Sequence, residues 1–195
     1  MKIPTGFPTS IRFRPKSISR AAVFGLIFAL TSFGVEGRQE QSVDEYRVKA
    51  AFLFNFAKFV EWPPEVLQDP SDPFAICVLG HDPFGRALDD IVAGKKIDGR
   101  AVAVRRISDP RQSVACRILF VSSSEPKRVL AVLAAMNQVG VLTVGESGNA
   151  TAEGMIINLT VEDGRVRFGI NMDSVGSEKL RFSSKLLSLA IALKK

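Results

Sequence analysis

Apolar residues between Ser42 and Val60 recur at the three- and four-residue spacing of an amphipathic helix. The helix is expected to begin at Ser42, because a serine followed three residues later by Glu45 matches a capping box. It is expected to end near Val60, because Pro63 and the proline after it cannot continue a helix. The pattern therefore predicts one long helix of about five turns.

This helix carries a second apolar face, which is formed by Phe52, Phe56 and Phe59. The whole apolar arc covers about half of the circumference, which is wider than a helix lying on one sheet needs. One interpretation is that Phe52, Phe56 and Phe59 contact a partner protein or a second subunit. The other is that the helix lies deep inside one domain. The sequence leaves both interpretations open.

Short apolar runs alternate with helical patterns along the rest of the chain. Strands are predicted at 74–79, 101–106, 116–121 and 139–144, and helices at 84–92 and 124–136. The runs Met155–Val161 and Arg165–Ile170 predict a β-hairpin with an Asp-Gly turn, and Ser183 begins a final amphipathic helix. This order predicts an α/β fold: a mainly parallel sheet flanked by helices on both faces, with an antiparallel C-terminal hairpin at one edge.

The first 37 residues have the layout of a bacterial secretory signal peptide. Five basic residues precede the uncharged apolar run Ala21–Leu30, and small and polar residues follow up to Gly37. The apolar run is shorter than the roughly 20 residues that a membrane span needs. Cleavage after Gly37 is expected, with a retained N-terminal anchor as the alternative. Residues 38–195 are then expected to form a single domain that works outside the cytoplasm.

The leader also accounts for most of the positive charge. The full chain has a formal net charge of +6, and residues 1–37 contribute +4 of it. The exported part is left at +2, which gives no electrostatic footprint for nucleic acid.

The chain has two cysteines, Cys77 and Cys116, and each lies in a strand-like apolar run. An oxidising compartment favours a disulfide between them. The alternative is that both are small buried hydrophobic residues in neighbouring strands. Two cysteines and a single histidine do not complete a closed zinc site, so neither a metal nor another cofactor is predicted.

That single histidine, His81, stands with Asp82 in the turn after the first predicted strand. Ligands of α/β proteins often bind at the carboxyl ends of parallel strands, so His81 and Asp82 are a possible ligand turn. The turn has neither the glycine spacing nor the Lys-Ser/Thr pair of a phosphate loop. His81 also has no serine or cysteine partner in a nucleophile motif, so the chain is not predicted to be an enzyme.

Several blocks of sequence, taken in order, resemble the YfiR-like family of periplasmic proteins. Together they cover about 44–192. The opening signature is Lys49–Pro63, followed by Ile76–Gly80 with Asp82–Gly85, Cys116–Phe120, Val141–Glu146, Gly154–Asn158, Val166–Asn171 and Ser183–Leu187.

The resemblance implies a periplasmic homodimer that binds the periplasmic sensor domain of a membrane diguanylate cyclase and represses cyclic-di-GMP synthesis. An outer-membrane lipoprotein with a peptidoglycan-binding domain is implied as the factor that sequesters the repressor. Cys77 and Cys116 match the family's bridged strand pair. Some relatives carry a second cysteine pair near the hairpin, but Thr151–Asn158 contains no cysteine.

Two functions therefore remain. The first is a repressor that acts by docking, for which an exposed apolar surface is expected. The second is a periplasmic small-solute-binding protein that feeds a membrane receptor or transporter, for which a cleft with convergent polar groups near His81 is expected.

Overall fold

The computed structural model describes residues 36–125, 133–134, 140–146 and 154–194. Glu40–Lys195 form one compact unit. The predicted signal peptide lies almost entirely outside the described residues, as does most of the helix predicted at 124–136. Among the described helices, none is both long enough and apolar enough to cross a membrane.

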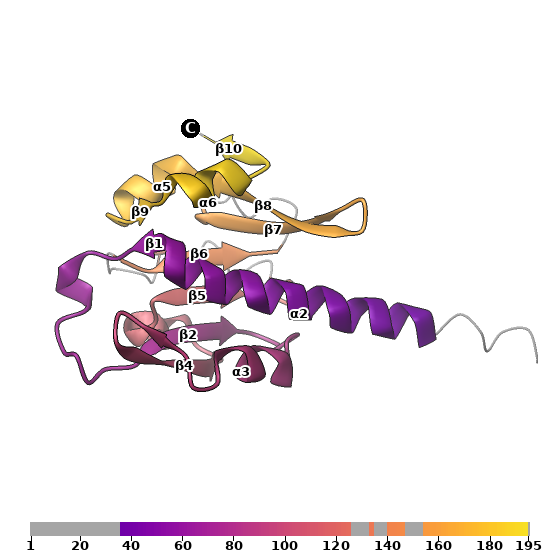
Figure 1. The fold of residues 1–195 in the computed structure, drawn as a ribbon, viewed down its shortest axis with the longest axis horizontal. Helices are drawn as coiled ribbons and strands as arrows, with labels where there is room; N and C mark the ends of the chain where they lie inside the picture. The colour runs from indigo at the N-terminus through magenta and orange to yellow at the C-terminus, as the bar shows by residue number, and fades with distance from the viewer. Residues whose placement is uncertain (1–35, 126–132, 135–139, 147–153, 195) are drawn as a thin grey trace, which may run out of the picture. The chain divides into compact units, whose positions relative to one another are not determined.

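An eight-stranded sheet runs through the larger unit in the order β10-β8-β7-β6-β5-β2-β4-β3 (Figure 1). Five neighbouring strands, from β7 to β4, are parallel. β8 is antiparallel to β7 but parallel to β10, and β3 is antiparallel to β4. The strands are β2 (Phe74–Leu79), β3 (Lys96–Ile97), β4 (Arg100–Ile107), β5 (Ile118–Val121), β6 (Leu142–Gly145), β7 (Ile157–Glu162), β8 (Arg165–Asn171) and β10 (Ala192–Lys194).

Helices and a small second sheet complete the described structure. The first long helix continues without a break into β1, which pairs antiparallel with β9. These elements are α2 (Glu36–Phe59), α3 (Arg86–Val92), α5 (Met172–Ser177), α6 (Ser184–Leu189), the 3-10 helices η1 (Pro64–Val66) and η2 (Pro110–Ala115), β1 (Val60–Glu61) and β9 (Arg181–Phe182). The result is the mixed α/β fold, with a mostly parallel sheet, that the alternating pattern predicts.

The start of α2 differs from the prediction. The helix runs through Ser42 and reaches back to Glu36, so Ser42 is not its N-cap. The residues between Gly37 and Ser42 include arginine, glutamine and glutamate, which are good helix formers, and no proline interrupts them. A capping-box pattern therefore does not begin a helix where the preceding residues can continue it.

The edge of the sheet also differs from the prediction. The predicted hairpin is present: β7 and β8 pair antiparallel through a turn in which Asp163 and Gly164 both have positive φ. This pair was predicted to form the edge, but β10 lies outside it, parallel to β8. The predicted last helix ends early: Ala190 is extended, and the N–H of Ile191 donates to the carbonyl of Phe168. β10 thereby covers backbone groups that an edge strand would leave unpaired.

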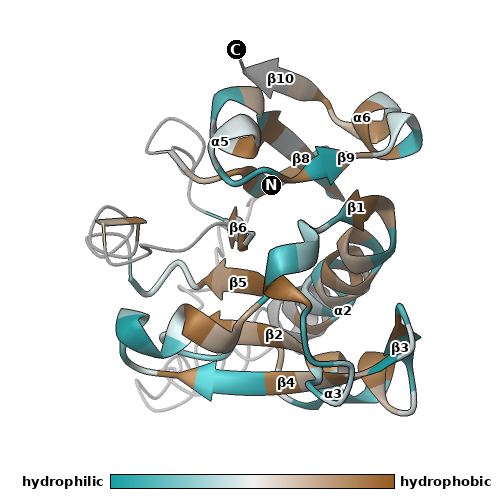
Figure 2. Ribbon diagram, turned by 90° about the vertical axis from the view of Figure 1, so that its left-hand side faces the viewer, coloured by the Kyte–Doolittle hydropathy of each residue, from teal (hydrophilic) through white to brown (hydrophobic). Residues whose placement is uncertain are grey.

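The two faces of the sheet have separate cores, because successive strand residues point to opposite faces. Phe74, Ile76 and Val78 of β2 belong to the core that α2 and α3 cover. Ala75, Cys77 and Leu79 of the same strand belong to a second core on the other face, against which Leu133 packs. Figure 2 shows hydrophobic residues along β2 and β5 and hydrophilic residues on β9 and the end of β4.

The interpretation of Phe52, Phe56 and Phe59 as an exposed face is wrong for Phe56. Phe56 is fully buried, and its ring lies 5.2 Å from that of Phe168 on β8. Phe52 and Phe59 are partly buried against the same core. The apolar arc is wide because the end of α2 also contacts C-terminal elements: Lys185 of α6 lies over the ring of Phe59, and the Ser183 N–H donates to the Phe59 carbonyl. The helix thus lies deep within one domain.

We expect Phe56→Ala to lower the free energy of unfolding by about 3–5 kcal/mol, because it leaves a cavity beside Phe168. Urea denaturation followed by circular dichroism measures the change. Asn55→Ala, at an exposed position of the same helix, is the matched control and should change stability by about 0.5 kcal/mol or less. Equal effects of the two substitutions would contradict the buried position of Phe56.

Candidate functional site

Loops at the carboxyl ends of β2 and β5 bring together polar residues that are far apart in the sequence. The two strands are parallel neighbours, so the residues that follow them meet at one edge of the sheet. Together with two residues of α2, they line a shallow cleft with a volume of about 490 Å³. We call it the strand-end cleft, and its lining residues are Val43, Tyr46, His81, Asp82, Pro83, Ser122, Ser123 and Ser124.

His81 and Asp82, the predicted ligand turn, both line this cleft. The backbone N–H of His81 donates to Ser124 Oγ at 3.1 Å, and the imidazole itself is exposed. The preceding residue must be glycine: Gly80 has a φ of +91°, and a Cβ there would lie 2.5 Å from the side chain of Glu125. The missing side chain lets the loop after β2 approach the loop after β5, and the hydrogen bond from His81 to Ser124 joins the two.

Asp82 is engaged by two partners. One carboxylate oxygen accepts from the backbone N–H of Phe84 at 2.8 Å, and the other accepts from Arg106 Nε at 2.9 Å. Arg106 also binds Asp89 on α3, which raises the pKa of the guanidinium and lowers that of Asp89. Asp82 therefore fixes the turn, and its carboxylate is already balanced by a cation.

A buried ion pair lies behind the cleft. Lys49 Nζ lies 2.7 Å from Glu146 Oε2 and 2.5 Å from Glu45 Oε1. The side chains of Lys49 and Glu146 are 5% and 2% exposed, so the charges compensate each other away from water. Glu146 Oε1 also accepts from the backbone N–H of Ser123 at 3.0 Å. One carboxylate at the end of β6 thus connects α2 to the loop after β5.

The charges shift the pKa values of neighbouring groups. Burial alone would lower the pKa of Lys49, but its hydrogen bonds with Glu146 and Glu45 raise it overall. The pKa of Tyr46 is raised, chiefly by burial and then by the negative charge of Glu146. Both groups therefore keep their protons through the physiological pH range.

Sequence reasoning singled out neither Lys49 nor Glu146 as site residues. A lysine one residue before the buried Ala50 in an apolar helix, and a glutamate directly after a buried strand, were the available signals. Their pairing spans 97 residues, and no local pattern encodes it.

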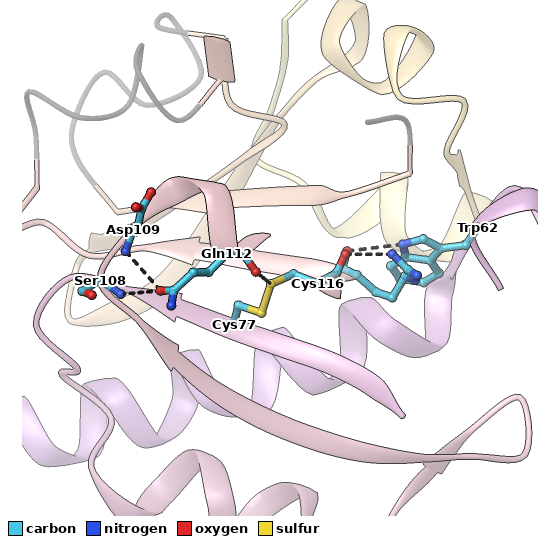
Figure 3. The surroundings of a disulfide bond; sticks show 7 residues. Trp62, Cys77, Ser108, Asp109, Gln112 and Cys116 are labelled. Carbon is cyan, nitrogen blue, oxygen red and sulfur yellow. Dashed lines mark hydrogen bonds between the residues drawn. A yellow bond between two sulfur atoms is a disulfide. The ribbon is translucent and has the colours of Figure 1, made fainter. Parts of the chain in front are cut away.

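Cys77 and Cys116 form the predicted disulfide, with Cα atoms 5.8 Å apart (Figure 3). Cys116 lies just before β5 rather than within it, at the end of η2. Gln112 of η2 accepts hydrogen bonds from the backbone N–H groups of Ser108 and Asp109, which completes a capping box (Figure 3). Both sulfur atoms belong to the second core and are shielded from solvent.

A second cleft, of about 470 Å³, lies at the other end of α2. Three of its lining residues, Ala57, Val60 and Trp62, are buried hydrophobic residues of the α2 and β1 region. Lys58 and Lys96 supply positive charge at its rim, opposite Glu61 and Asp98. We call it the helix-end cleft, and its lining residues are Ala57, Lys58, Val60, Glu61, Trp62, Leu67, Lys96, Ile97 and Asp98.

The described residues offer no ready metal centre: within 36–125, 133–134, 140–146 and 154–194, no three His, Cys, Asp or Glu side chains are grouped to hold an ion. The imidazole of His81 forms no hydrogen bond with a described residue that would make it part of a nucleophile pair.

A family model described as YfiR/HmsC-like matches residues 46–191. The chain belongs to the YfiR/HmsC-like family. The match includes the disulfide, the strand-end cleft except Val43, and the whole helix-end cleft. This family is associated with the regulation of diguanylate cyclases and is regulatory rather than enzymatic.

Two solved structures are similar to part of the chain. A conserved domain protein from Vibrio cholerae is 13% identical, and the alignment covers 62% of this chain and 54% of that protein with a TM-score of 0.45. An ABC domain from Streptococcus pneumoniae, in complex with L-Trp, is 7% identical, with coverage of 62% and 55% and a TM-score of 0.46. This chain spans about half the length of each. TM-scores this low carry no conclusion about function.

Replacing both cysteines, Cys77→Ser with Cys116→Ser, should lower the free energy of unfolding by about 4 kcal/mol, because the bridge closes a loop of 39 residues. Differential scanning calorimetry measures the accompanying fall in Tm. We expect the substitution to change partner affinity less than it changes Tm. A large loss of partner affinity at unchanged Tm would instead assign the bridge a regulatory role.

Removing the positive charge of the buried Lys49–Glu146 pair should lower the free energy of unfolding. Lys49→Met leaves Glu146 charged and buried, so we expect a loss of about 3–5 kcal/mol in urea denaturation. Adding Glu146→Gln should recover part of this loss, and Lys58→Met at an exposed position is the control.

The same pair predicts a pH dependence. Because the pKa of Lys49 is higher in the folded state than its ordinary value of 10.5, its stabilisation is fully present below that pH. Stability should fall as the pH rises through the folded pKa, and Lys49→Met should lose this alkaline dependence.

Proposed function

We propose that this protein is a periplasmic repressor that binds the sensor domain of an inner-membrane diguanylate cyclase and lowers cyclic-di-GMP synthesis without catalysing a reaction. The observation that carries the proposal is the family match, which covers most of the described fold. A buried disulfide suits an oxidising compartment, which supports periplasmic location. The bound sensor domain would be held in the conformation that keeps the cyclase inactive.

The docking surface that we propose is the outer side of α2 near its end, together with the helix-end cleft and α6. Lys185 of α6 lies over the ring of Phe59 at 5.2 Å, so the two helices present one continuous face. Leu189 on α6 and the nearby Ile191 are 59% and 44% exposed, and exposed apolar side chains of this size favour protein contacts. Phe59 keeps a role in this surface, whereas Phe56 has none.

The charge around this face indicates the chemistry of the partner. Lys58 and Lys96 line the helix-end cleft together with Glu61 and Asp98, which balance their charge. Lys185, beside Phe59, adds one further positive charge to the proposed surface. An acidic segment with apolar anchors is therefore the expected partner surface. An outer-membrane peptidoglycan-binding lipoprotein would relieve repression by competing for the same face. The homodimer implied by the resemblance stays a prediction.

A second candidate is the solute-binding protein that feeds a membrane receptor or transporter. The observation that favours it is the strand-end cleft, which lies where α/β proteins bind ligands.

An affinity pull-down from detergent-solubilised membranes of the native cell tests the repressor. The tagged protein should recover an inner-membrane diguanylate cyclase, identified by mass spectrometry. The charge reversals Lys58→Glu and Lys185→Glu together should then weaken binding to that cyclase's purified periplasmic domain about tenfold or more, measured by surface plasmon resonance.

The matched control reverses two exposed arginines on β8, Arg165→Glu with Arg167→Glu, which changes the net charge equally. Equal losses from both variants would show that only overall charge matters and would reject the proposed surface. Recovery of a transporter or receptor in place of a cyclase would favour the solute-binding protein.

A further inference from the structure

We propose that the strand-end cleft is a ligand site for a small uncharged compound that carries several hydroxyl groups, of the sugar class. This inference goes beyond the repressor function, because docking on the other end of α2 requires no ligand. The inference rests on three observations: the order of the strands in the sheet, the ion pairs that neutralise the charged side chains beside the cleft, and the side chains that line the cleft.

The cleft lies at a reversal of strand order. β2 connects through α3 to β4 on one side, whereas β5 connects to β6 on the other side. The two connections also use opposite faces: Leu88 of α3 packs in the core under α2, and Leu133, between β5 and β6, packs against the second core. Diverging connections open a crevice at the carboxyl ends of the strands, where open α/β sheets bind ligands. His81 follows β2 and Ser123 follows β5 at this crevice.

An anion is disfavoured by what already occupies the site. The N–H of Ser123, the backbone donor that an anion would use, is taken by the carboxylate of Glu146. Lys49 behind it is compensated by two glutamates, and Arg106 beside Asp82 binds two aspartates. Among the described residues that line the cleft, none is a lysine or arginine. No uncommitted positive charge therefore faces the cleft.

The lining suits a neutral ligand with hydroxyl groups. Ser123 and Ser124 are exposed hydroxyls that can donate and accept, and the exposed imidazole of His81 can do either. Tyr46 and Pro83 supply apolar surface beside these polar groups. A shallow, open cleft with alternating hydroxyl and apolar surface complements a sugar ring, which has a polar rim and apolar C–H faces.

The site is held in shape before any ligand binds. The loop after β2 is fixed by the hydrogen bond between His81 and Ser124, by the bond from the Phe84 N–H to Asp82, and by the ion pair of Asp82 with Arg106. The loop after β5 is fixed by Glu146. Preorganised polar groups lose less entropy on binding, which allows a small ligand to bind measurably.

Isothermal titration calorimetry on the oxidised protein, purified as the cell exports it, tests the site. The probes are D-glucose, D-ribose and N-acetyl-D-glucosamine, with inorganic phosphate and putrescine as charged comparators. We expect at least one sugar to bind with a Kd of about 1 mM or tighter and the charged probes to bind more weakly. His81→Ala and Ser123→Ala should each weaken that binding roughly tenfold.

Lys96→Ala, in the helix-end cleft, is the control and should leave sugar affinity unchanged. Thermal melts of each variant separate a lost contact from a lost fold, because His81 and Ser123 are exposed and their replacement should leave Tm close to that of the parent.

Stronger binding of phosphate or putrescine than of any sugar would overturn the ligand class. Absence of binding by all five probes, or binding that His81→Ala and Ser123→Ala leave intact, would overturn the site. None of these outcomes bears on whether the protein docks to a cyclase.

Discussion

The packing of α2 against one face of the sheet is the interaction on which the rest of the structure depends. Leu53 and Phe56, on the side of α2 that faces the sheet core, are fully buried. Edge-to-face ring contacts extend from it in two directions: Phe56 meets Phe168 on β8, and Tyr46 meets Phe84 after β2. α2 therefore contacts both the C-terminal strand β8 and the loop after β2, and so fixes their relative positions. Without it, the apolar side chains on that face would lie open to water.

This packing also explains why the two clefts are separate. Around its middle, α2 contributes Tyr46 to the strand-end cleft and Lys49 to the ion pair behind it. Near its end it contributes Lys58 to the helix-end cleft. The helix thus connects a polar site with compensated charge to a cleft that lysine and acidic side chains line together.

The elements of the fold could be predicted where local pattern decides them. The buried strand at Phe74–Leu79 matches its apolar run, and the N-cap of α6 at Ser183 matches its side-chain chemistry. The start of α2 could not be predicted from the capping box, because it depends on the residues that precede Ser42. The outermost strand could not be predicted, because it depends on a strand that lies beside it in the fold. β10 forms only because β8 offers an open edge. His81 and Asp82 could be placed by the rule on strand ends, whereas Lys49 and Glu146 meet only through the tertiary fold.

The disulfide has a topological consequence. Because it joins Cys77 to Cys116, the chain between them is a closed covalent ring that contains α3, β3 and β4, one whole side of the sheet. If that side opened by local unfolding, its ends would stay fixed beside β5 on the second core. A cut by a protease inside the ring would leave both fragments linked. Local unfolding or cleavage within 77–116 can therefore disorder this side of the sheet, but the disulfide keeps the segment attached to the rest of the protein.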